Sequence, residues 1–289
     1  MKILLLGIFF VCLNTFTGSS FDAITKYLSI NNYKWYHYYS IGGTAAIILF
    51  ILLFFTNGEI KKHLTLKNKN HFYFLILRGI SFIPVLLIVF YSLKYIPISL
   101  FATLIMTSPF FLLIFAKIIL KEKLNYISWV AILIGFCGVL IVLRPSLSNI
   151  NIFIFLVFFA VLIISFNFTI VSKYSHIATS YGFTFYQYLP ITLFAYIFFI
   201  FDPLVPSLKE FILFSSAGVL MMISMWAWNK AYHIAGKYSS IISPFFFTQI
   251  IWGSLYGILF FSEELSSMSI MGVIIIVISG TIAIYNRNK

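Results

Sequence analysis

Ten apolar stretches alternate with short polar segments along this chain of 289 residues. Each stretch is about as long as a membrane-crossing helix, because a helix rises ~1.5 Å per residue and the hydrocarbon layer of a bilayer is ~30 Å thick. The pattern predicts an all-α membrane protein with ten transmembrane helices. The predicted spans are residues 3–21, 37–56, 72–93, 98–119, 126–143, 151–171, 181–201, 211–229, 238–261 and 267–285.

The composition argues against a water-soluble domain. Hydrophobic residues make up 62% of the chain and charged residues 9%, and a soluble fold of this size has too little interior for so much Phe, Ile and Leu. The net charge of +12 would suit a nucleic-acid-binding protein. The charges, however, lie mainly on one side of the membrane. If the amino terminus is cytoplasmic, thirteen Lys and Arg residues lie at the inner ends of the spans and five at the outer ends. This positive-inside bias predicts two cytoplasmic termini and contact with anionic lipid rather than with nucleic acid.

Signatures of soluble enzymes are missing from the sequence. The two cysteines, Cys12 and Cys137, both lie in apolar spans, so we expect neither a disulfide framework nor a metal site. There is no glycine-rich phosphate loop, no pair of metal ligands and no nucleophile beside a base. The sequence therefore predicts a protein that is not an enzyme and that uses no cofactor.

The two halves of the chain resemble each other weakly. Shifting the sequence by 147 or 141 residues superimposes like residues, for example Phe21 on Phe168, Lys26 on Lys173, Tyr91 on Tyr232 and Glu122 on Glu263. We therefore predict a first repeat over residues 1–145 and a second over residues 146–289. Because five helices is an odd number, the second copy is upside down. Two inverted five-helix repeats are common in secondary transporters, whose substrate site lies between the halves near the middle of the membrane.

Polar and aromatic side chains near the middle of the predicted spans are candidates for that site. They are Asn14, Thr107, Gln249 and Trp252, together with Trp228 as an aromatic surface for a flat or cationic substrate. Proline residues within spans free backbone carbonyls beside a polar cavity, and they are Pro84, Pro109, Pro190 and Pro244. The alternative is that Thr side chains bond their own helix, that prolines mark packing kinks and that aromatic residues form interfacial belts.

Arg78 is the strongest single signal, because it is a permanent charge within the third predicted span. An Arg at the centre of a span costs about 2.5–3.5 kcal/mol on insertion scales. It could bind a carboxylate or phosphate of the substrate through bidentate hydrogen bonds. The alternative, which the sequence slightly favours, is that Arg78 reaches towards the inner surface and binds carbonyls or lipid phosphate.

Charged residues gather at the outer ends of the predicted spans. Asp22 and Lys26 are one helical turn apart, which favours a surface ion pair between them. The other interpretation is a proton-sensitive outer gate formed by Asp22, His37 and Glu263, because His titrates near neutral pH. The predicted spans place no carboxylate deep in the membrane, so a carboxylate that carries protons at mid-membrane is not expected.

Several short motifs are spread over the whole chain. They are residues 21–28 (FDAITKYL), 77–79 (LRG), 95–97 (YIP), 107–109 (TSP), 120–124 (LKEKL), 243–245 (SPF), 249–253 (QIIWG) and 257–260 (GILF), with Glu263. The chain thereby resembles the EamA-type drug/metabolite transporters, a ten-helix inverted-repeat family, and is most similar to the branch of S-adenosylmethionine uptake carriers. It departs from that branch in span 2, where no basic residue lies near residues 39–41.

The resemblance implies a carrier in the bacterial inner (plasma) membrane with a cavity lined by spans 1–4 and 6–9. Spans 5 and 10 then lie outside, and their small residues serve packing or contact in a homodimer. We expect a secondary transporter that moves a small organic metabolite by alternating access, such as S-adenosylmethionine or a similar nucleotide-like or vitamin-like compound. The alternatives are an amino-acid or drug exporter of this family, and a non-transporting membrane subunit that assists lipid modification.

Overall fold

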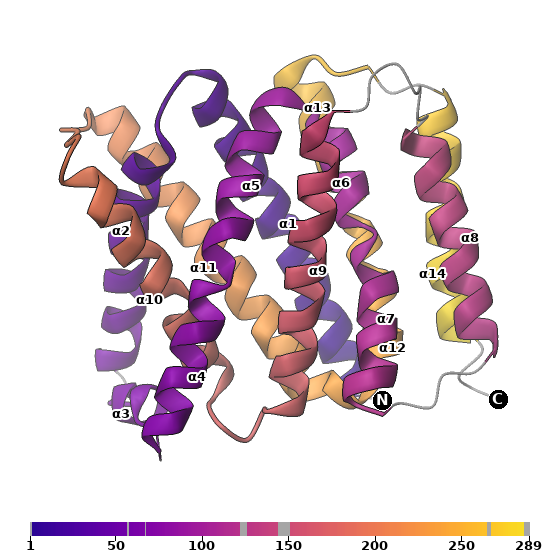
Figure 1. Ribbon diagram of the computed structural model, residues 1–289, viewed down its shortest axis with the longest axis horizontal. Helices are drawn as coiled ribbons and strands as arrows, with labels where there is room; N and C mark the ends of the chain where they lie inside the picture. The colour runs from indigo at the N-terminus through magenta and orange to yellow at the C-terminus, as the bar shows by residue number, and fades with distance from the viewer. Residues whose placement is uncertain are drawn as a thin grey trace.

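The computed structural model describes residues 2–56, 58–66, 68–121, 126–143, 151–264 and 267–285, and within these ranges every regular element is a helix (Figure 1). The helices are α1 (Lys2–Ile30), α2 (Trp35–Thr56), α3 (Ile60–Leu64), α4 (Lys69–Ile80), α5 (Phe82–Tyr95), α6 (Ile98–Ile105), α7 (Ser108–Ile119), α8 (Tyr126–Leu143), α9 (Ile152–Lys173), α10 (Ser180–Phe199), α11 (Leu208–Ala235), η2 (Gly236–Tyr238), α12 (Ser239–Ile242), η3 (Ser243–Phe247), α13 (Thr248–Phe261) and α14 (Ser267–Tyr285).

Seven helical stretches in the described residues are long and apolar enough to cross a membrane. They are Lys2–Ile30, Trp35–Phe55, Lys69–Tyr95, Ile98–Leu120, Ile152–Lys173, Ser180–Phe199 and Leu208–Tyr238. The other three predicted segments hold α8, the series from η2 to α13, and α14. The prediction of an all-helical chain with many membrane-length helices is therefore confirmed.

The first helix is longer than the hydropathy pattern predicts. It continues past residue 21 to Ile30 and ends before Asn32, whose φ of 61° lies in the left-handed region that commonly terminates helices. Hydropathy placed the boundary at Phe21 because Asp22 and Lys26 are charged. Both residues instead lie within α1 and are buried, so they belong to the interior of the bundle.

Prolines break some of the predicted spans into shorter helices. The third span divides into α4 and α5 at Ser81, with Pro84 in the first turn of α5. The fourth divides into α6 and α7, with Pro109 at the start of α7. The ninth contains the 3-10 helix η3, which carries Pro244 in its first turn. A proline fits these positions because the first turn of a helix leaves its backbone N–H groups unbonded in any case.

The helices form a bundle, and two of them make up a pair at one edge of it (Figure 1). In the interior, α1 packs against α11 and α13, while α5 packs against α9. Helices α8 and α14 lie side by side at the right of Figure 1, and α14 reaches the rest of the bundle chiefly through η3. The interior of the bundle is therefore formed by α1, α5, α9, α11 and α13, and not by α8 or α14.

Candidate functional site

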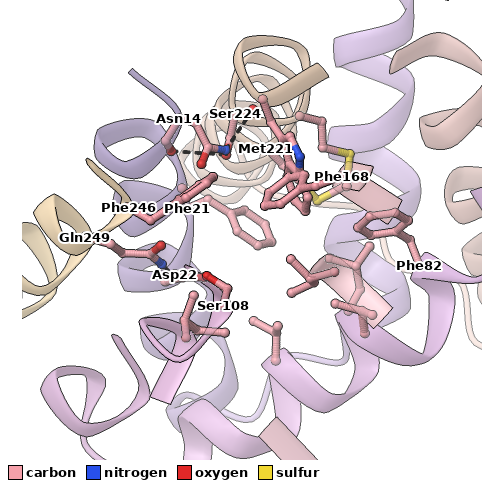
Figure 2. Close-up of a pocket in the computed structure, with 18 of the residues that line it drawn as sticks. Asn14, Phe21, Asp22, Phe82, Ser108, Phe168, Met221, Ser224, Phe246 and Gln249 are labelled. Carbon is pink, nitrogen blue, oxygen red and sulfur yellow. Dashed lines mark hydrogen bonds between the residues drawn. The ribbon is translucent and has the colours of Figure 1, made fainter. Parts of the chain in front are cut away.

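A cavity lies where α1, α5, α9, α11 and α13 approach one another (Figure 2). Its walls are mostly aromatic rings, aliphatic chains and the thioethers of Met221 and Met225. The polar side chains in its lining are those of Asn14, Asp22, Ser108, Ser224 and Gln249. Its volume of about 110 Å³ is below the ~300–1,000 Å³ of typical small-molecule sites. The cavity is therefore smaller than a typical small-molecule site.

Residues on one face of α1 form the polar side of the cavity. Asn14, Gly18 and Asp22 follow at intervals of four, a spacing that places them on the same face of a helix. The Asn14 side-chain amide donates to the carbonyl oxygen of Ser224 at 2.9 Å and to its hydroxyl at 2.8 Å. The sequence could have revealed this face from the four-residue spacing, but it gave no sign of Ser224.

Asp22 faces the cavity without a cationic partner. It is 7% exposed, and the Gln249 amide nitrogen donates to its Oδ2 atom at 3.3 Å. Among the described residues no ion pair includes Asp22, because Lys26 binds Glu263 instead. The expected surface pair between Asp22 and Lys26 is therefore wrong. Asp22 also lies eight residues inside the end of α1, about 12 Å along the helix, whereas the predicted span ended just before it.

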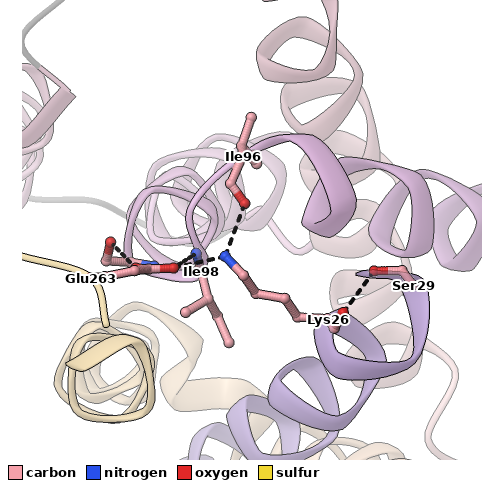
Figure 3. A network of polar contacts seen from close by, with 6 residues as sticks. Lys26, Ser29, Ile96, Ile98 and Glu263 are labelled. Atoms are coloured by element: carbon pink, nitrogen blue, oxygen red, sulfur yellow. Dashed lines mark hydrogen bonds and ion pairs between the residues drawn. The ribbon is translucent and has the colours of Figure 1, made fainter. Parts of the chain in front are cut away.

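Lys26 and Glu263 form an ion pair one helical turn beyond Asp22 along α1 (Figure 3). Lys26 Nζ lies 2.7 Å from Glu263 Oε1. The same carboxylate accepts from the backbone N–H of Ile98 at 2.8 Å, and from the N–H and hydroxyl of Ser99 at 3.1 and 2.6 Å. Burial by itself would raise the pKa of Glu263, but these bonds outweigh it and lower the pKa. Glu263 thus caps the first turn of α6 and holds α1 beside it.

An aromatic layer forms the opposite wall. Trp228 of α11 contacts Phe168 of α9, and its ring centroid lies 5.8 Å from that of Phe82 in α5. All three rings are buried and line the cavity. The prediction that Trp228 provides an aromatic surface agrees with this position.

Three predicted site residues lie elsewhere. The Thr107 hydroxyl donates to the carbonyl of Leu104 at 2.7 Å, which is the local bonding given above as the alternative. Trp252 packs on Phe16 with 5.0 Å between ring centroids, outside the lining of the cavity. A ring nitrogen of His37 lies 2.8 Å from the carbonyl oxygen of Asp202, so His37 joins neither Asp22 nor Glu263.

Arg78 does not line this cavity either. It is 6% exposed and lies beyond Phe82, with its guanidinium carbon 5.8 Å from the centroid of that ring. One guanidinium nitrogen donates to the Asn229 side-chain oxygen at 2.9 Å. Arg78 instead lines a separate cavity together with Ser81 and Asn167.

No group of three or more His, Cys, Asp or Glu side chains in the described ranges could hold a metal ion. The amides and the carboxylate of the central cavity are suited to binding an organic molecule by hydrogen bonds, and its rings to stacking on that molecule.

Comparison with known proteins identifies the class of protein. Residues 5–144 match the EamA-like transporter family. The first half of the chain is thus similar to an EamA-like transporter domain. The family resemblance drawn from the motifs is thereby confirmed, and with its apolar helices this EamA-like chain is a multi-pass membrane protein.

Two transporters share sequence with this EamA-like chain over much of its length. The riboflavin transporter of Vibrio cholerae is 31% identical over 185 residues, which cover 64% of this chain and 61% of that protein. The chain thus spans less than two thirds of the length of that relative. The pseudopaline exporter CntI of Pseudomonas aeruginosa is 24% identical over 207 residues, which cover 71% of this chain and 72% of the exporter.

A solved crystal structure has the same fold. It superimposes with a TM-score of 0.73 over 99% of this chain and 98% of its own length, at 12% sequence identity. At this identity the likeness concerns the fold alone.

Proposed function

We propose that this chain is a secondary transporter that carries a small organic metabolite across the bacterial inner membrane by alternating access. The observation that supports this most directly is the central cavity, in which Asn14, Asp22 and Gln249 are gathered among aromatic rings. Polar groups within hydrocarbon are costly, and they are most often kept where they bind a substrate or an ion.

The proposed architecture is ten spans in two inverted repeats, residues 1–145 and 146–289. The sequence Ser-Pro-Phe-Phe occurs at residues 108–111 and again at 243–246. The first copy begins α7 and the second begins η3, so each follows a break in a helix. Broken helices at corresponding places in two halves are typical of transporter binding sites.

Close helix contacts support the same symmetry. A Cβ atom on Gly79 of α4 would meet the backbone oxygen of Tyr186 in α10, and a Cβ on Gly218 of α11 would meet the backbone of Gly42 in α2. In the proposed numbering, span 3 (α4) contacts span 7 (α10), and span 8 (α11) contacts span 2 (α2). Spans 3 and 8 are equivalent in the two repeats, and so are spans 2 and 7. Two repeats related by an axis in the membrane plane would produce this exchange.

The walls of the cavity favour a planar heterocyclic substrate. Rings such as Phe168 and Trp228 can stack on a flat molecule, while the amide of Gln249 can bond the polar edge of a heterocycle. Riboflavin, the substrate named for the Vibrio relative, has this chemistry, and so do the nucleotide-like compounds suggested by the sequence, S-adenosylmethionine among them. Export of an amino acid, a drug or a pseudopaline-like compound is the second candidate, because the pseudopaline exporter aligns over more of its own length.

Asp22 is the residue that we propose for coupling to protons or to a cationic group. A carboxylate in an apolar cavity without a cation is costly, so it gains from binding a proton or a positively charged ligand. Lys26 and Glu263 are proposed as the gate beyond it, on the outer side if both termini are cytoplasmic. His37 has no role in this scheme because it binds the Asp202 loop.

Transport in proteoliposomes tests the proposal. Riboflavin, adenosine and S-adenosylmethionine are offered with a proton gradient and, separately, in exchange against the same compound inside. Asn14→Ala and Gln249→Ala should each lower kcat/KM by about ten-fold or more, because each removes a buried hydrogen-bonding group. Asn31→Ala is the matched control, since Asn31 is exposed and its side-chain amide donates to the carbonyl of Tyr27 in α1. Wild-type transport rates in both variants would show that the cavity is not the substrate site. If the wild-type protein transports none of the three compounds, that result would count against the proposed function.

Topology is tested separately by labelling with a membrane-impermeant maleimide. The two native cysteines, Cys12 and Cys137, are replaced by serine, and single cysteines are introduced as Lys2→Cys or Tyr285→Cys. Both should react only from the cytoplasmic side. Reaction from opposite sides would contradict the inverted repeat.

A further inference from the structure

A second polar cluster lies just beyond the aromatic wall of the central cavity. It consists of Arg78 of α4, Thr184 and Gln187 of α10, and Asn229 of α11. The Asn229 side-chain oxygen accepts from Arg78 at 2.9 Å, and its nitrogen donates to Thr184 at 3.1 Å and to Gln187 at 3.2 Å. The Asn229 amide is therefore fixed with its oxygen towards the guanidinium.

The positive charge of Arg78 has no negative partner in the part of the chain that the structure describes. Among the ion pairs of the described residues none includes Arg78, and its two acceptors are neutral, the Asn229 amide and the carbonyl of Phe183 at 3.4 Å. Its Nε atom and the side-chain nitrogen of Gln187 are buried without an acceptor in this part of the chain. A buried charge and two unsatisfied donors are costly together, and an anion would relieve that cost.

Space for such an anion adjoins Arg78. A cavity between α4, α7 and α9 is lined by Arg78, Ser81 and Asn167 among apolar side chains. The Asn167 amide donates to the Ser81 hydroxyl at 3.1 Å, which places two more polar groups in the same wall. Phe82, one turn further along, lines the central cavity, and its ring centroid lies 5.8 Å from the guanidinium carbon of Arg78.

The depth of Arg78 distinguishes two sources of an anion. It lies nine residues after Lys69, where α4 begins, which is about 14 Å along the helix. Lipid phosphates lie outside the hydrocarbon layer, so this depth favours a molecule that travels through the bundle over a lipid headgroup.

We propose that Arg78, oriented by Asn229, forms a second binding site that takes the carboxylate or phosphate group of an anionic transported molecule after it leaves the central cavity. This inference rests on the transport function proposed above, and it specifies that the preferred substrate is an anion. Guanidinium is suited to the role because it donates two parallel hydrogen bonds to either group.

Two pairs of probes that differ by one phosphate test the site. Riboflavin is compared with riboflavin 5′-phosphate, and adenosine with adenosine 5′-phosphate, by isothermal titration of the full chain in phosphatidylcholine nanodiscs. The wild-type chain should bind the phosphorylated member of at least one pair about ten-fold more tightly, because hydrogen bonds between charged groups are the strong ones. Equal affinity within both pairs would overturn the proposal.

Two variants assign the preference to Arg78. Arg78→Gln removes the charge, while Asn229→Asp keeps Arg78 and supplies a carboxylate of nearly the same shape beside it, so that the fold is retained. Both should abolish the preference for the phosphorylated probe. Lys117→Gln is the control, since Lys117 is an exposed basic residue on α7. A preference that survives in both variants would overturn the proposal.

Lipid and substrate as sources of the anion are separated by repeating the titration with phosphatidylglycerol in the nanodiscs. An unchanged preference supports a site for the transported molecule, whereas its loss in anionic lipid alone would assign Arg78 to lipid and overturn the proposal. If neutral probes bind and are transported but no phosphate preference exists, this inference alone fails. If no probe binds at all, the proposed function fails with it.

Discussion

Lys26 Nζ and Glu263 Oε1 lie 2.7 Å apart, although the two residues are 237 positions apart in the sequence. Their side chains are 9% and 12% exposed. Because Glu263 also binds the first turn of α6 through Ile98 and Ser99, one carboxylate joins α1, α6 and the segment that follows α13. A motion that separates α1 from the start of α6 on this side would have to break the contact.

Glu263→Gln should open this side of the protein. The substitution removes the charge that attracts Lys26, at a cost of about 1–3 kcal/mol for hydrogen bonds between charged groups. We expect a maleimide to label Ile96→Cys about ten-fold faster in the variant, since 1.4 kcal/mol corresponds to a factor of ten. Ile96 is 5% exposed and its carbonyl oxygen accepts from Lys26 at 3.4 Å, so it reports directly on the contact.

The neighbouring Glu264 provides the control. It is exposed, and Glu264→Gln removes the same charge one residue away. Labelling of Ile96→Cys in Glu264→Gln should match that in the otherwise unchanged chain. Equal acceleration in both variants would mean that net charge, and not the Lys26 contact, governs accessibility.

The contact should be stable at neutral pH and weaken only in acid. Because the pKa of Glu263 is lowered in the folded chain, its contribution to stability is present above the unfolded pKa of about 4.3 and is lost as the pH falls through the lower folded value. The melting temperature of the wild-type chain should therefore exceed that of Glu263→Gln at pH 7 and pH 5. The difference should shrink below about pH 4. A difference that disappears between pH 7 and pH 5 would contradict the lowered pKa.

Hydropathy identified the helices and part of the cavity for a physical reason. In hydrocarbon a polar side chain is costly, so the few that occur within apolar spans are informative by themselves. Asn14 and Gln249 were found in this way, and both line the cavity. Thr107 was selected by the same criterion but donates to the carbonyl of Leu104, because a hydroxyl has a single donor that the nearby backbone can satisfy.

Partner choice was not available from the sequence. Spacing favoured Asp22 with Lys26, but the residues that they contact, Gln249 and Glu263, lie more than two hundred positions away. Local spacing describes neighbours on one helix surface and says nothing about a second helix packed against it. The first span was predicted to end too early, at residue 21, for the same reason. A hydropathy pattern places the end of a span at a charged residue, because the sequence does not show the buried partner of that residue.

Two tryptophans distinguish the cavity from its surroundings. Trp228 lines the cavity beside Phe168, whereas Trp252 packs on Phe16 outside the lining. Trp228→Leu should raise KM for a ring-bearing substrate about five-fold, because loss of stacking on an aromatic side chain costs about 1 kcal/mol. Trp252→Leu should leave KM within about two-fold of the wild-type value. The measurement is uptake into proteoliposomes that contain equal amounts of each variant. A larger rise in KM for Trp252→Leu than for Trp228→Leu would show that the substrate binds beside Trp252 and not in the central cavity.

Gly218 and Gly42 should be among the positions least tolerant of a larger side chain. A Cβ on Gly218 would overlap the carbonyl group of Gly42, and one on Gly42 would overlap the carbonyl oxygen of Phe214. Backbone atoms on two packed helices cannot move aside, so Gly218→Ala should destabilise the fold by at least about 1–3 kcal/mol, the usual cost of overpacking. Gly18→Ala is the comparison, because its new methyl group would meet the Ser224 hydroxyl at 3.1 Å, and a side chain can rotate. Melting temperatures in one detergent should fall much further for Gly218→Ala than for Gly18→Ala. Equal melting temperatures would show that α2 and α11 separate more easily than their backbone contact implies.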